Sequence, residues 1–468
     1  MKPLDHCGVV GIVSNDNVTR FIYFCLRALQ HRGQESAGIS IYNHYNNKIE
    51  TKKDMGLVNE VFKLKTIEDL EGKSGIGHVR YSTTGMSELR NAQPIVVSSS
   101  IGDIGVAHNG DLINAEILRK ELQKKGWAFI TTSDSEIIIR LLADQITVTN
   151  DIVRAIRNVM GKIKGSYSLT ILVENRIYAV RDPFGIKPLC FGRLENGFVT
   201  ASESAALDAI GAKLIRDVLP GEIIEFKKDG FVSYKAKSAK NKAHCMFEYV
   251  YFARADAIID KKCVYDVRVK IGKKLFEENP LDADIICSVP DSGTSYAIGF
   301  SSASKIPFAE GLMKNRFVYR TFILPYQKHR DITVREKLNP IRSVVKGKRV
   351  VLVDDSIVRG TTMRKIVKMV RNSGAKEVHV RIGTPPIIAP CYFGIDMKTR
   401  DQFIARNEEI PNIAKKIGVD SLGYISIKGL VECIGIKEND LCLGCLTAEY
   451  PIKIPGERIR FQKKLDLY

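Results

Sequence analysis

The sequence predicts two domains that both mix helices and strands, the second of them built on a parallel sheet. A chain of 468 residues is too long for one hydrophobic core, so two or three domains are expected. After Cys245, strand-like and helix-like segments alternate, which is typical of parallel strands joined by crossover helices. The run Val350–Val353 is one such strand, because it is entirely apolar and rich in β-branched residues, as a strand buried on both faces should be.

Two carboxylates and a glycine turn follow this strand. Asp354 and Asp355 come at its carboxyl end, where open α/β sheets bind their ligands. Gly360 permits a tight turn, and Thr361 and Thr362 offer hydroxyl and backbone N–H groups at a helix start, which suits a phosphate dianion. Paired carboxylates also suit ribose hydroxyls and Mg²⁺. On its own, an Asp pair after a strand is more often a solvated loop or a helix cap.

The whole run VVLVDDSIVRGTT, residues 350–362, resembles the signature of the type I phosphoribosyltransferases, which bind phosphoribosyl pyrophosphate (PRPP). The resemblance implies an α/β domain with a parallel sheet and a bound Mg²⁺. It assigns Asp354 and Asp355 to the metal. It assigns the turn that follows to the substrate, through Arg359, Gly360, Thr361 and Thr362.

A second loop of the same domain is PDSGTSYAIG, residues 290–299, which opens a helix after the short apolar strand 285–289. Such a small-residue loop exposes backbone N–H groups suited to pyrophosphate. The same resemblance assigns Asp291 and Gly293 to the substrate and Ser292 to the metal. A plain glycine-containing turn between strand and helix is the alternative for this loop.

Residues 316–339 are dense in arginine and lysine and contain a proline in mid-run, which predicts a flexible basic loop. By resemblance, the corresponding segment of the family closes over PRPP and excludes water. Solvated surface is the competing interpretation.

The N-terminal half opens on a thiol, because the strand-like run Cys7–Val13 follows the first six residues directly. Alone, such a cysteine would usually be a small buried hydrophobe. Four further polar motifs follow apolar stretches, in the order QHRGQESAG (30–38), GHVRYSTTG (77–85), AHNGDL (107–112) and TSDSE (132–136). Together they resemble the glutamine amidotransferase domain of the N-terminal nucleophile (Ntn) hydrolases. This α+β fold packs two sheets between two helix layers, and the resemblance spans about residues 7–226.

The chemistry explains why the cysteine must come first. Amide hydrolysis needs a nucleophile and a proton acceptor, and a terminal α-amino group has a pKa of about 7.7–8.0. An internal Cys7 has only an amide nitrogen, which is no base. We therefore predict that Met1–His6 are a propeptide whose removal places the general base beside its own thiol.

Four other residues of this domain receive roles from the resemblance. Arg80 holds the glutamine carboxylate, Asp134 holds the α-ammonium group, and Asn109 with the Gly110 N–H forms the oxyanion hole. The residue types suit these roles, since arginine binds carboxylates in a bidentate way and oxyanion holes need fixed donors. Each motif has an alternative: Arg80 could be a surface ion pair, Asn109–Gly110 a hairpin turn, and Ser133 with Glu136 a capping box.

A C-x₂-C pair, Cys442 and Cys445, lies near the C-terminus, and Cys245 and Cys391 are expected outside the sheet core. Four thiolates suit either Zn²⁺ or a [4Fe–4S] cluster, and spacing does not choose between them. The chain as a whole resembles the iron–sulfur branch of the glutamine PRPP amidotransferases, which favours the cluster as a structural group. Cys433 lies close by and is left out, because the family pattern uses the C-x₂-C pair.

Composition bounds the remaining possibilities. Hydrophobic residues at 44% and charged residues at 26% are typical of a soluble globular protein, and no apolar run approaches the ~20 residues needed to cross a bilayer. The first six residues lack the apolar core of a secretion signal, which predicts a cytoplasmic location. Ten scattered cysteines predict reactive or metal-bound thiols in a reducing compartment.

The resemblance covers nearly the whole chain and implies an amidophosphoribosyltransferase, the enzyme of the first committed step of purine synthesis. Glutamine, PRPP and water would give phosphoribosylamine, glutamate and pyrophosphate. It further implies a homo-oligomer inhibited by purine nucleotides, with no membrane or nucleic-acid partner. The expected domains are the propeptide (1–6), the glutamine domain (7–240), the transferase domain (241–400) and a C-terminal segment that wraps back (401–468).

A rival function comes from the net charge of +18, which favours anionic partners including nucleic acid. The rival is a PRPP-sensing regulator that binds nucleic acid without catalysis. The basic residues are spread along the whole chain, however, and no basic arm, zinc finger or aromatic RNA-binding motif accompanies them. A nearer rival, a glutamine enzyme that transfers ammonia to a sugar phosphate, is excluded by the run 350–362.

Overall fold

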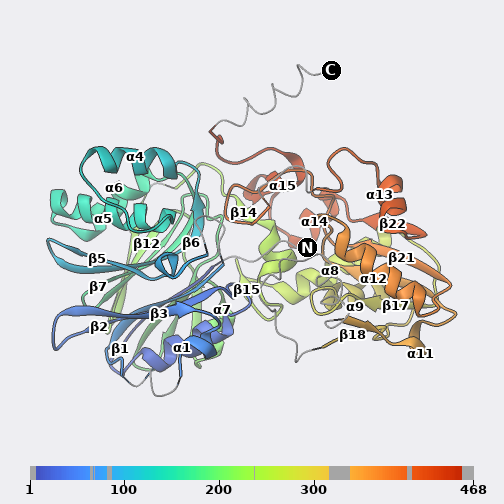
Figure 1. Ribbon diagram of the computed structural model, residues 1–468, viewed down its shortest axis with the longest axis horizontal. Coiled ribbons are helices and arrows are strands. Elements are labelled where there is room, and N and C mark those ends of the chain that lie inside the picture. The colour runs from blue at the N-terminus through green and yellow to red at the C-terminus, as the bar shows by residue number, and fades with distance from the viewer. Residues whose placement is uncertain are drawn as a thin grey trace.

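The computed structural model describes residues 7–63, 67, 69–81, 87–236, 238–315, 338–397 and 403–455. They form two bodies that lie side by side, the N-terminal one in blue and green and the C-terminal one in yellow and red (Figure 1). Among these residues no helix is long and apolar enough to cross a membrane.

The N-terminal body contains two antiparallel sheets. The first has seven strands in the order β11-β9-β10-β1-β4-β2-β3. Its strands are β1 (Gly8–Ser14), β2 (Ser36–Asn43), β3 (Lys48–Met55), β4 (Ser74–Arg80), β9 (Cys190–Leu194), β10 (Gly197–Ala201) and β11 (Lys213–Asp217). The second has six, in the order β13-β12-β8-β7-β6-β5. They are β5 (Ile95–Ser99), β6 (Gly102–Leu112), β7 (Gly165–Val173), β8 (Arg176–Arg181), β12 (Glu222–Lys227) and β13 (Gly230–Lys235).

Helices cover the outer face of each sheet. The first sheet carries α1 (Thr19–Ala28), α2 (Val58–Val61) and α7 (Ser204–Asp208), and the second carries α4 (Ala115–Lys124), α5 (Asp134–Thr149) and α6 (Ile152–Lys162). Separate apolar clusters fill the two helix–sheet interfaces, and a third lies between the sheets. This helix–sheet–sheet–helix layering confirms the predicted Ntn-hydrolase architecture.

The C-terminal body is built on a parallel sheet of order β17-β20-β21-β22. The strands are β17 (Ile285–Ser288), β20 (Arg349–Asp354), β21 (Glu377–Ile382) and β22 (Ser421–Tyr424). Val351 and Val353 of β20 pack in the same core as α8 (Val264–Glu278) and α9 (Thr294–Ser304), whereas Val350 and Leu352 pack with α12 (Thr361–Asn372) and α13 (Ile410–Ile417). The strand is therefore buried on both faces, as predicted.

Shorter elements complete this body. They are β14 (His244–Cys245), η2 (Glu248–Phe252), β15 (Ile258–Ile259), β16 (Lys262–Cys263), β18 (Leu312–Lys314), β19 (Leu338–Pro340), α11 (Arg342–Val345), α14 (Ile427–Ile434), η4 (Glu438–Asp440), β23 (Leu441–Cys442) and α15 (Gly444–Thr447). The segment after residue 402 gives β22 to the transferase sheet and then returns to the domain junction, where β23 pairs in parallel with β14.

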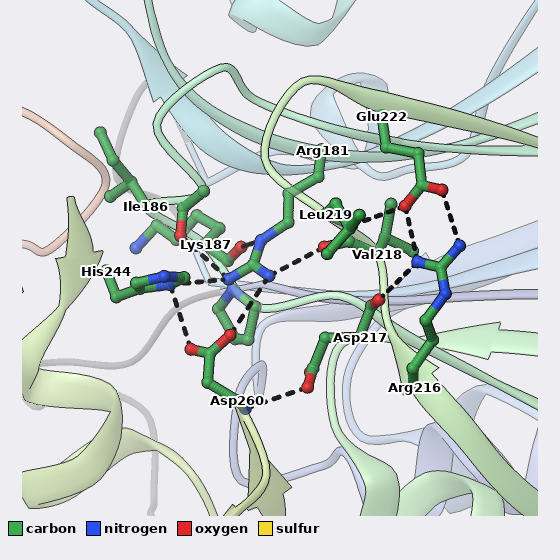
Figure 2. Close-up of polar contacts among 12 residues, drawn as sticks. Arg181, Ile186, Lys187, Arg216, Asp217, Val218, Leu219, Glu222, His244 and Asp260 are labelled. Carbon is green, nitrogen blue, oxygen red and sulfur yellow. Dashed lines mark hydrogen bonds and ion pairs between the residues drawn. The ribbon is translucent and has the colours of Figure 1, made fainter. Parts of the chain in front are cut away.

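The junction between the bodies is polar (Figure 2). Arg181, fully buried at the end of β8, donates to the carbonyls of Lys187 and Val218 at 2.8 and 2.9 Å. Its guanidinium also lies 3.7 Å from Asp260, which in turn lies 3.0 Å from His244. Because every group in this set has a partner, a charged side chain can be buried where the two domains meet.

Candidate active sites

The Cys7 thiol lies directly before β1 and donates a hydrogen bond to the Tyr81 carbonyl over 3.5 Å. Burial raises the pKa of this thiol to about 11, against the opposing effect of Arg80 and with a further increase from Asp134 and Glu35. At neutral pH the thiol is therefore protonated, and it needs a base before it can act as a nucleophile. Met1–His6, the predicted propeptide, lie outside the described residues.

Arg80 ends β4 and its guanidinium pairs with Glu35. The arginine is only 2% exposed, so it is not the surface ion pair considered as its alternative. Asp134 opens α5, accepts a bond of 3.0 Å from the Leu112 N–H and lies 3.7 Å from Nδ1 of His108. A buried cation and a buried carboxylate thus flank the Cys7 thiol, an arrangement that fits a zwitterionic amino acid.

Asn109 and Gly110 lie within β6 and face Ser168 and Tyr167 of β7 in a continuous ladder, so they do not form a hairpin turn. Asn109 is 0% exposed, and both polar atoms of its amide lack a hydrogen-bond partner among the residues that the structure describes. Such an unsatisfied buried donor is costly unless a ligand completes it. At position 110 a Cβ would lie 2.0 Å from the Ser166 carbonyl, so only glycine fits.

In the transferase domain, Asp354 ends β20 and Asp355 follows it, both buried. The Asp355 N–H donates to the Asp354 carboxylate over 2.9 Å, and the Ser356 hydroxyl donates to the Asp355 carboxylate over 2.5 Å. The Thr384 hydroxyl fixes the backbone by a 2.5 Å bond to the Asp355 carbonyl. The acid pair is therefore held by its own neighbours at the strand end, where the sequence predicted it.

The loop of residues 290–293 lies against the same strand end. The Val289 N–H donates to the Val353 carbonyl over 2.9 Å, and a Cβ on Gly293 would lie 2.4 Å from that carbonyl. The structure thus brings the loop that carries Asp291, Ser292 and Gly293 beside Asp354. The Asp291 side chain is 66% exposed and pairs with Lys314.

Gly360 precedes α12 in a left-handed conformation with φ of +73°, which confirms the predicted turn. Arg359 and Thr361 flank it and are exposed. A cavity of about 680 Å³ begins at these residues and runs between α12 and α13, with a cationic lining that includes Arg364, Lys368, Arg371, Lys415 and Lys416. The predicted basic loop at 316–339 lies outside the described residues except for Leu338 and Asn339, which belong to β19.

The four predicted cluster ligands converge at the domain junction. Cys245 of β14 lies directly opposite Cys442 of β23, and the Cys445 carbonyl accepts bonds from the N–H groups of residues 388 and 389, near Cys391. Burial raises the pKa of Cys245 to about 12, and a negative charge on Cys391 would raise it further. Burial likewise raises the pKa of Cys445, and its three partners raise it more. Burial raises the pKa of Cys433, in α14, to about 11, with smaller effects from Lys274 and nearby glutamates.

The four-cysteine site fits soft thiolate chemistry. All four thiols are free, and the Phe393 N–H donates to the Cys391 sulfur over 3.3 Å, as hydrogen bonds to the sulfurs of iron–sulfur clusters do. Within the described part of the chain, no group of three or more His, Cys, Asp or Glu is arranged to hold a metal ion. Four thiolates suit Zn²⁺ and a cluster equally, so the preference for a cluster rests on the family resemblance alone.

Comparison with known proteins identifies the family. Residues 78–209 match the model of a glutamine amidotransferase domain, and residues 306–383 match that of a phosphoribosyl transferase domain. The chain is 52% identical to an amidophosphoribosyltransferase of Methanocaldococcus jannaschii, over 97% of this chain and 99% of that protein. The chain belongs to the amidophosphoribosyltransferase family. The relative from Synechococcus elongatus is 44% identical over 99% of this chain and 95% of its own length.

A solved structure agrees with this family. It is a glutamine PRPP amidotransferase from B. subtilis in complex with ADP and GMP, which matches with a TM-score of 0.90 and 41% identity. The match covers 96% of this chain and 98% of that one. As an amidophosphoribosyltransferase, the chain is an enzyme that joins a glutamine amidotransferase domain to a phosphoribosyl transferase domain, as the sequence predicted.

Three residues near these sites received no role from the sequence. Glu35 and His108 were inside quoted motifs, but only the structure shows that they contact Arg80 and Asp134. Lys187, in the segment RDPFGIKPL, is completely buried. For Lys187 the sequence did offer a signal, because this lysine stands between an isoleucine and a proline.

Proposed function

We propose that the chain makes 5-phosphoribosylamine, glutamate and pyrophosphate from glutamine, PRPP and water, as the first committed step of purine synthesis. The observation that carries the proposal is the buried Asn109 amide, which has no hydrogen-bond partner among the described residues, in a domain where Arg80 and Asp134 act on the Cys7 thiol. The second domain of the same chain presents an acid pair at a strand end. Together these groups supply an oxyanion hole, a nucleophile and a sugar-phosphate site.

In the glutamine domain, removal of Met1–His6 gives Cys7 a free α-amine, which takes the proton of the thiol. The sulfur then attacks the side-chain amide of glutamine, and the negative oxygen accepts hydrogen bonds from Asn109 and the Gly110 N–H. Arg80 and Asp134 hold the carboxylate and the ammonium group of the substrate. Ammonia leaves, and water releases glutamate from the thioester.

In the transferase domain, ammonia attacks C1 of the ribose as pyrophosphate leaves. Asp354, Asp355 and Ser292 would hold Mg²⁺, which when bound neutralises charge on the pyrophosphate oxygens. The N–H groups around Asp291 and Gly293 bind the pyrophosphate. The phosphate on the ribose lies at the start of α12, against Arg359, Gly360, Thr361 and Thr362.

We further propose that Cys245, Cys391, Cys442 and Cys445 bind a [4Fe–4S] cluster with a structural task, because it would tie the junction to the C-terminal segment. Protein purified without oxygen should be brown and contain about four irons per chain. Stoichiometric zinc in a colourless protein would contradict the assignment.

The remaining expectations stay proposals. The domain limits are 1–6, 7–240 and 241–400, with 401–468 supplying β22 and then the cluster ligands. The enzyme is a cytoplasmic homo-oligomer inhibited by purine nucleotides, and nucleic acid is not a partner. The solved relative that carries ADP and GMP supports the nucleotide part of this proposal.

Substitution of the nucleophile tests the division of labour. Cys7→Ser should lose glutamine-dependent synthesis by about a thousandfold or more and keep synthesis from ammonium within about twofold, because the second site is untouched. Cys25→Ser is the matched control, since this buried thiol donates to the Ala206 carbonyl and a hydroxyl can do the same. Equal loss of both nitrogen sources in Cys7→Ser would contradict the proposal.

Maturation is tested by intact mass. Active protein should begin at Cys7, and full activity in a chain that still carries Met1 would overturn the role of the α-amine.

A further inference from the structure

Strand β6 extends beyond its neighbour β5, which leaves one edge of β6 open beside the glutamine site. β5 pairs only with residues 102–106 of β6, whereas the pairing of β6 with β7 continues to Leu112. The Asp111 N–H points toward β7, where it donates to the Ser166 hydroxyl over 3.3 Å. Because N–H groups alternate between the two edges of a strand, those of His108, Gly110 and Leu112 point to the open edge.

Side chains take the place of the missing strand at two of these three groups. The His108 N–H donates to Oε1 of Gln93 over 2.8 Å, and the Leu112 N–H donates to the Asp134 carboxylate over 3.0 Å. Gly110 lies midway between them, so its N–H points to the same side as the carboxylate assigned to the α-ammonium group. A backbone N–H between two fixed neighbours is a pre-organised donor, as an oxyanion hole requires.

Gln93 belongs to a short segment, residues 91–93, that also holds the loop before α5. The Asn91 side chain exchanges two bonds with Thr132: its amide donates to the Thr132 hydroxyl over 2.9 Å, and its oxygen accepts from the Thr132 N–H over 3.0 Å. Thr132 lies two residues before Asp134, the first residue of α5. Asn91 and Gln93 are both buried, so these bonds are shielded from water.

The segment is itself fixed against β2 and β3. The side-chain nitrogen of Lys53, in β3, donates to the carbonyls of Ala92 and Pro94 over 2.7 and 3.0 Å. A Cβ on Gly38, in β2, would lie 2.2 Å from the Gln93 carbonyl oxygen, so the two backbones are in direct contact. The first sheet therefore supports a segment whose side chains reach both β6 and the start of α5.

We propose that Asn91 and Gln93 are positioning residues for glutamine hydrolysis, which hold the two halves of the glutamine site in register. Gln93 positions the strand that carries the oxyanion donors Asn109 and Gly110. Asn91 positions the start of α5, where Asp134 binds the α-ammonium group. The inference rests on the proposed function, because the roles of Asn109, Gly110 and Asp134 are those assigned above.

Glutaminase kinetics of the full-length enzyme test the role of Gln93. Gln93→Met removes the acceptor and keeps the length of the side chain. It should lower kcat for glutamine by about 10–10²-fold with little change in KM, because a displaced oxyanion donor weakens binding of the transition state and not of the substrate. Gln145→Met is the matched control, since this buried glutamine lies further along α5 and bonds to Asn158 over 2.9 Å. The control should keep kcat within about twofold.

A pair of variants tests the role of Asn91 independently. Asn91→Ala should raise KM for glutamine by about tenfold and change kcat less, because the ammonium group is bound alike in the substrate and in the transition state. Asn91→Asp should keep KM near the wild-type value, since a carboxylate can accept from both the Thr132 hydroxyl and its N–H. Ammonium-dependent synthesis should be unchanged in every variant, because the transferase site is untouched.

The outcomes separate this inference from the proposed function. Wild-type kcat in Gln93→Met would overturn the role of Gln93. Wild-type KM in Asn91→Ala, or an equal increase of KM in Asn91→Ala and Asn91→Asp, would overturn the role of Asn91. Parallel loss of glutamine-dependent and ammonium-dependent synthesis would make both residues structural and would overturn the inference. Glutamine-dependent synthesis that survives in Cys7→Ser would overturn the proposed function itself, whatever the other variants do.

Discussion

The two candidate active sites differ in how their polar groups are exposed to water. At the glutamine site, Arg80, Asn109 and Asp134 are all buried, and the ionic groups have partners within the protein. At the transferase site the acid pair is buried, while the side chains of Asp291 and Thr361 are exposed. The first site is assembled before the substrate arrives, whereas much of the second faces solvent.

Because of this difference, we expect stability and catalysis to depend on the same residues at the glutamine site and on different residues at the transferase site. A buried ion pair contributes to stability mainly because the loss of one partner leaves the other charge without compensation. Substitutions at the glutamine site should therefore change both stability and catalysis. Exposed groups at the transferase site are screened by water, and their loss should affect catalysis alone.

The largest expected effect is at the acid pair. The double substitution Asp354→Asn and Asp355→Asn should lower synthesis from both glutamine and ammonium by about 10⁴-fold, since metal-ion catalysis is worth several kcal/mol. The thermal midpoint should change little, because the asparagine side chains can still accept the bonds from the Asp355 N–H and the Ser356 hydroxyl. Assays with each nitrogen source and a thermal melt measure both quantities. A large fall in the thermal midpoint would contradict the statement that the transferase site affects catalysis more than stability.

The next effect concerns Arg32, in the loop that precedes Glu35. Its fully buried guanidinium bonds to Glu203 in the glutamine domain and to Glu248 in η2. Arg32→Ala should lower the free energy of unfolding by about 3–5 kcal/mol, because two buried carboxylates lose their partner. Denaturant unfolding at pH 7 measures the loss. Arg371→Ala, which removes an exposed pair with Asp420, should cost no more than about 1 kcal/mol.

The pH dependence of this effect has a definite sign. Burial raises the pKa of Glu203, but Arg32 and His31 lower it more, so the pKa lies well below its usual value. A depressed carboxyl pKa stabilises the fold above the unfolded pKa of about 4.3, and the stabilisation is lost as the pH falls below that value. The difference in the free energy of unfolding between wild type and Arg32→Ala should thus become smaller in acid. A difference that becomes larger below pH 4 would contradict the lowered pKa of Glu203.

A smaller effect is expected at Asn109. Asn109→Ala should lower kcat for glutamine by about 10²–10³-fold, or about 2.7–4 kcal/mol, with KM little changed. Since no described residue bonds to the amide, its removal should keep or increase the stability of the fold. Glutaminase kinetics and a thermal melt test both statements. Loss of stability without loss of kcat would make Asn109 a packing residue.

Local order in the sequence predicted the strand, the acid pair and the glycine turn of the transferase site, and the family resemblance assigned their ligands. A buried parallel strand, two acids and a glycine turn occupy consecutive residues, and the burial of Val350–Val353 on both faces follows from their apolar character. The glutamine site could not be derived in this way. Its residues come from separate strands, so their proximity depends on strand order, and only the family resemblance named them.

Some contacts could be foreseen neither from local sequence patterns nor from the family resemblance. The charge of Glu35 gave no sign that its partner is Arg80, because the pairing of β2 with β4 brings them together. Long-range register and helix packing decide such contacts, and local patterns do not report them.

The smallest expected effect tests whether a buried charge outside the active sites also lowers the stability of the fold. Asp217 ends β11 at the domain junction and accepts a 3.0 Å bond from the Asp260 N–H. Burial and then the charge of Asp260 raise its pKa to about 6. A raised carboxyl pKa means that the folded state holds a proton which the unfolded state has released, between pH values of about 3.9 and 6. The fold should therefore lose stability as the pH rises through this window.

Asp217→Asn removes this cost, because the amide oxygen can still accept the Asp260 N–H and carries no charge. The variant should match wild type near pH 4 and be more stable by up to about 3 kcal/mol at pH 7, since one pKa unit corresponds to about 1.4 kcal/mol. Denaturant unfolding at both pH values measures the difference, and other carboxyl groups cancel in it. Asp229→Asn, at an exposed residue of the same domain, should change stability equally little at both. If Asp217→Asn does not increase the free energy of unfolding at pH 7, the buried charge of Asp217 does not lower stability. Buried charges would then lower stability only at the active sites, where the substrate compensates them, and the difference between the two sites would be larger.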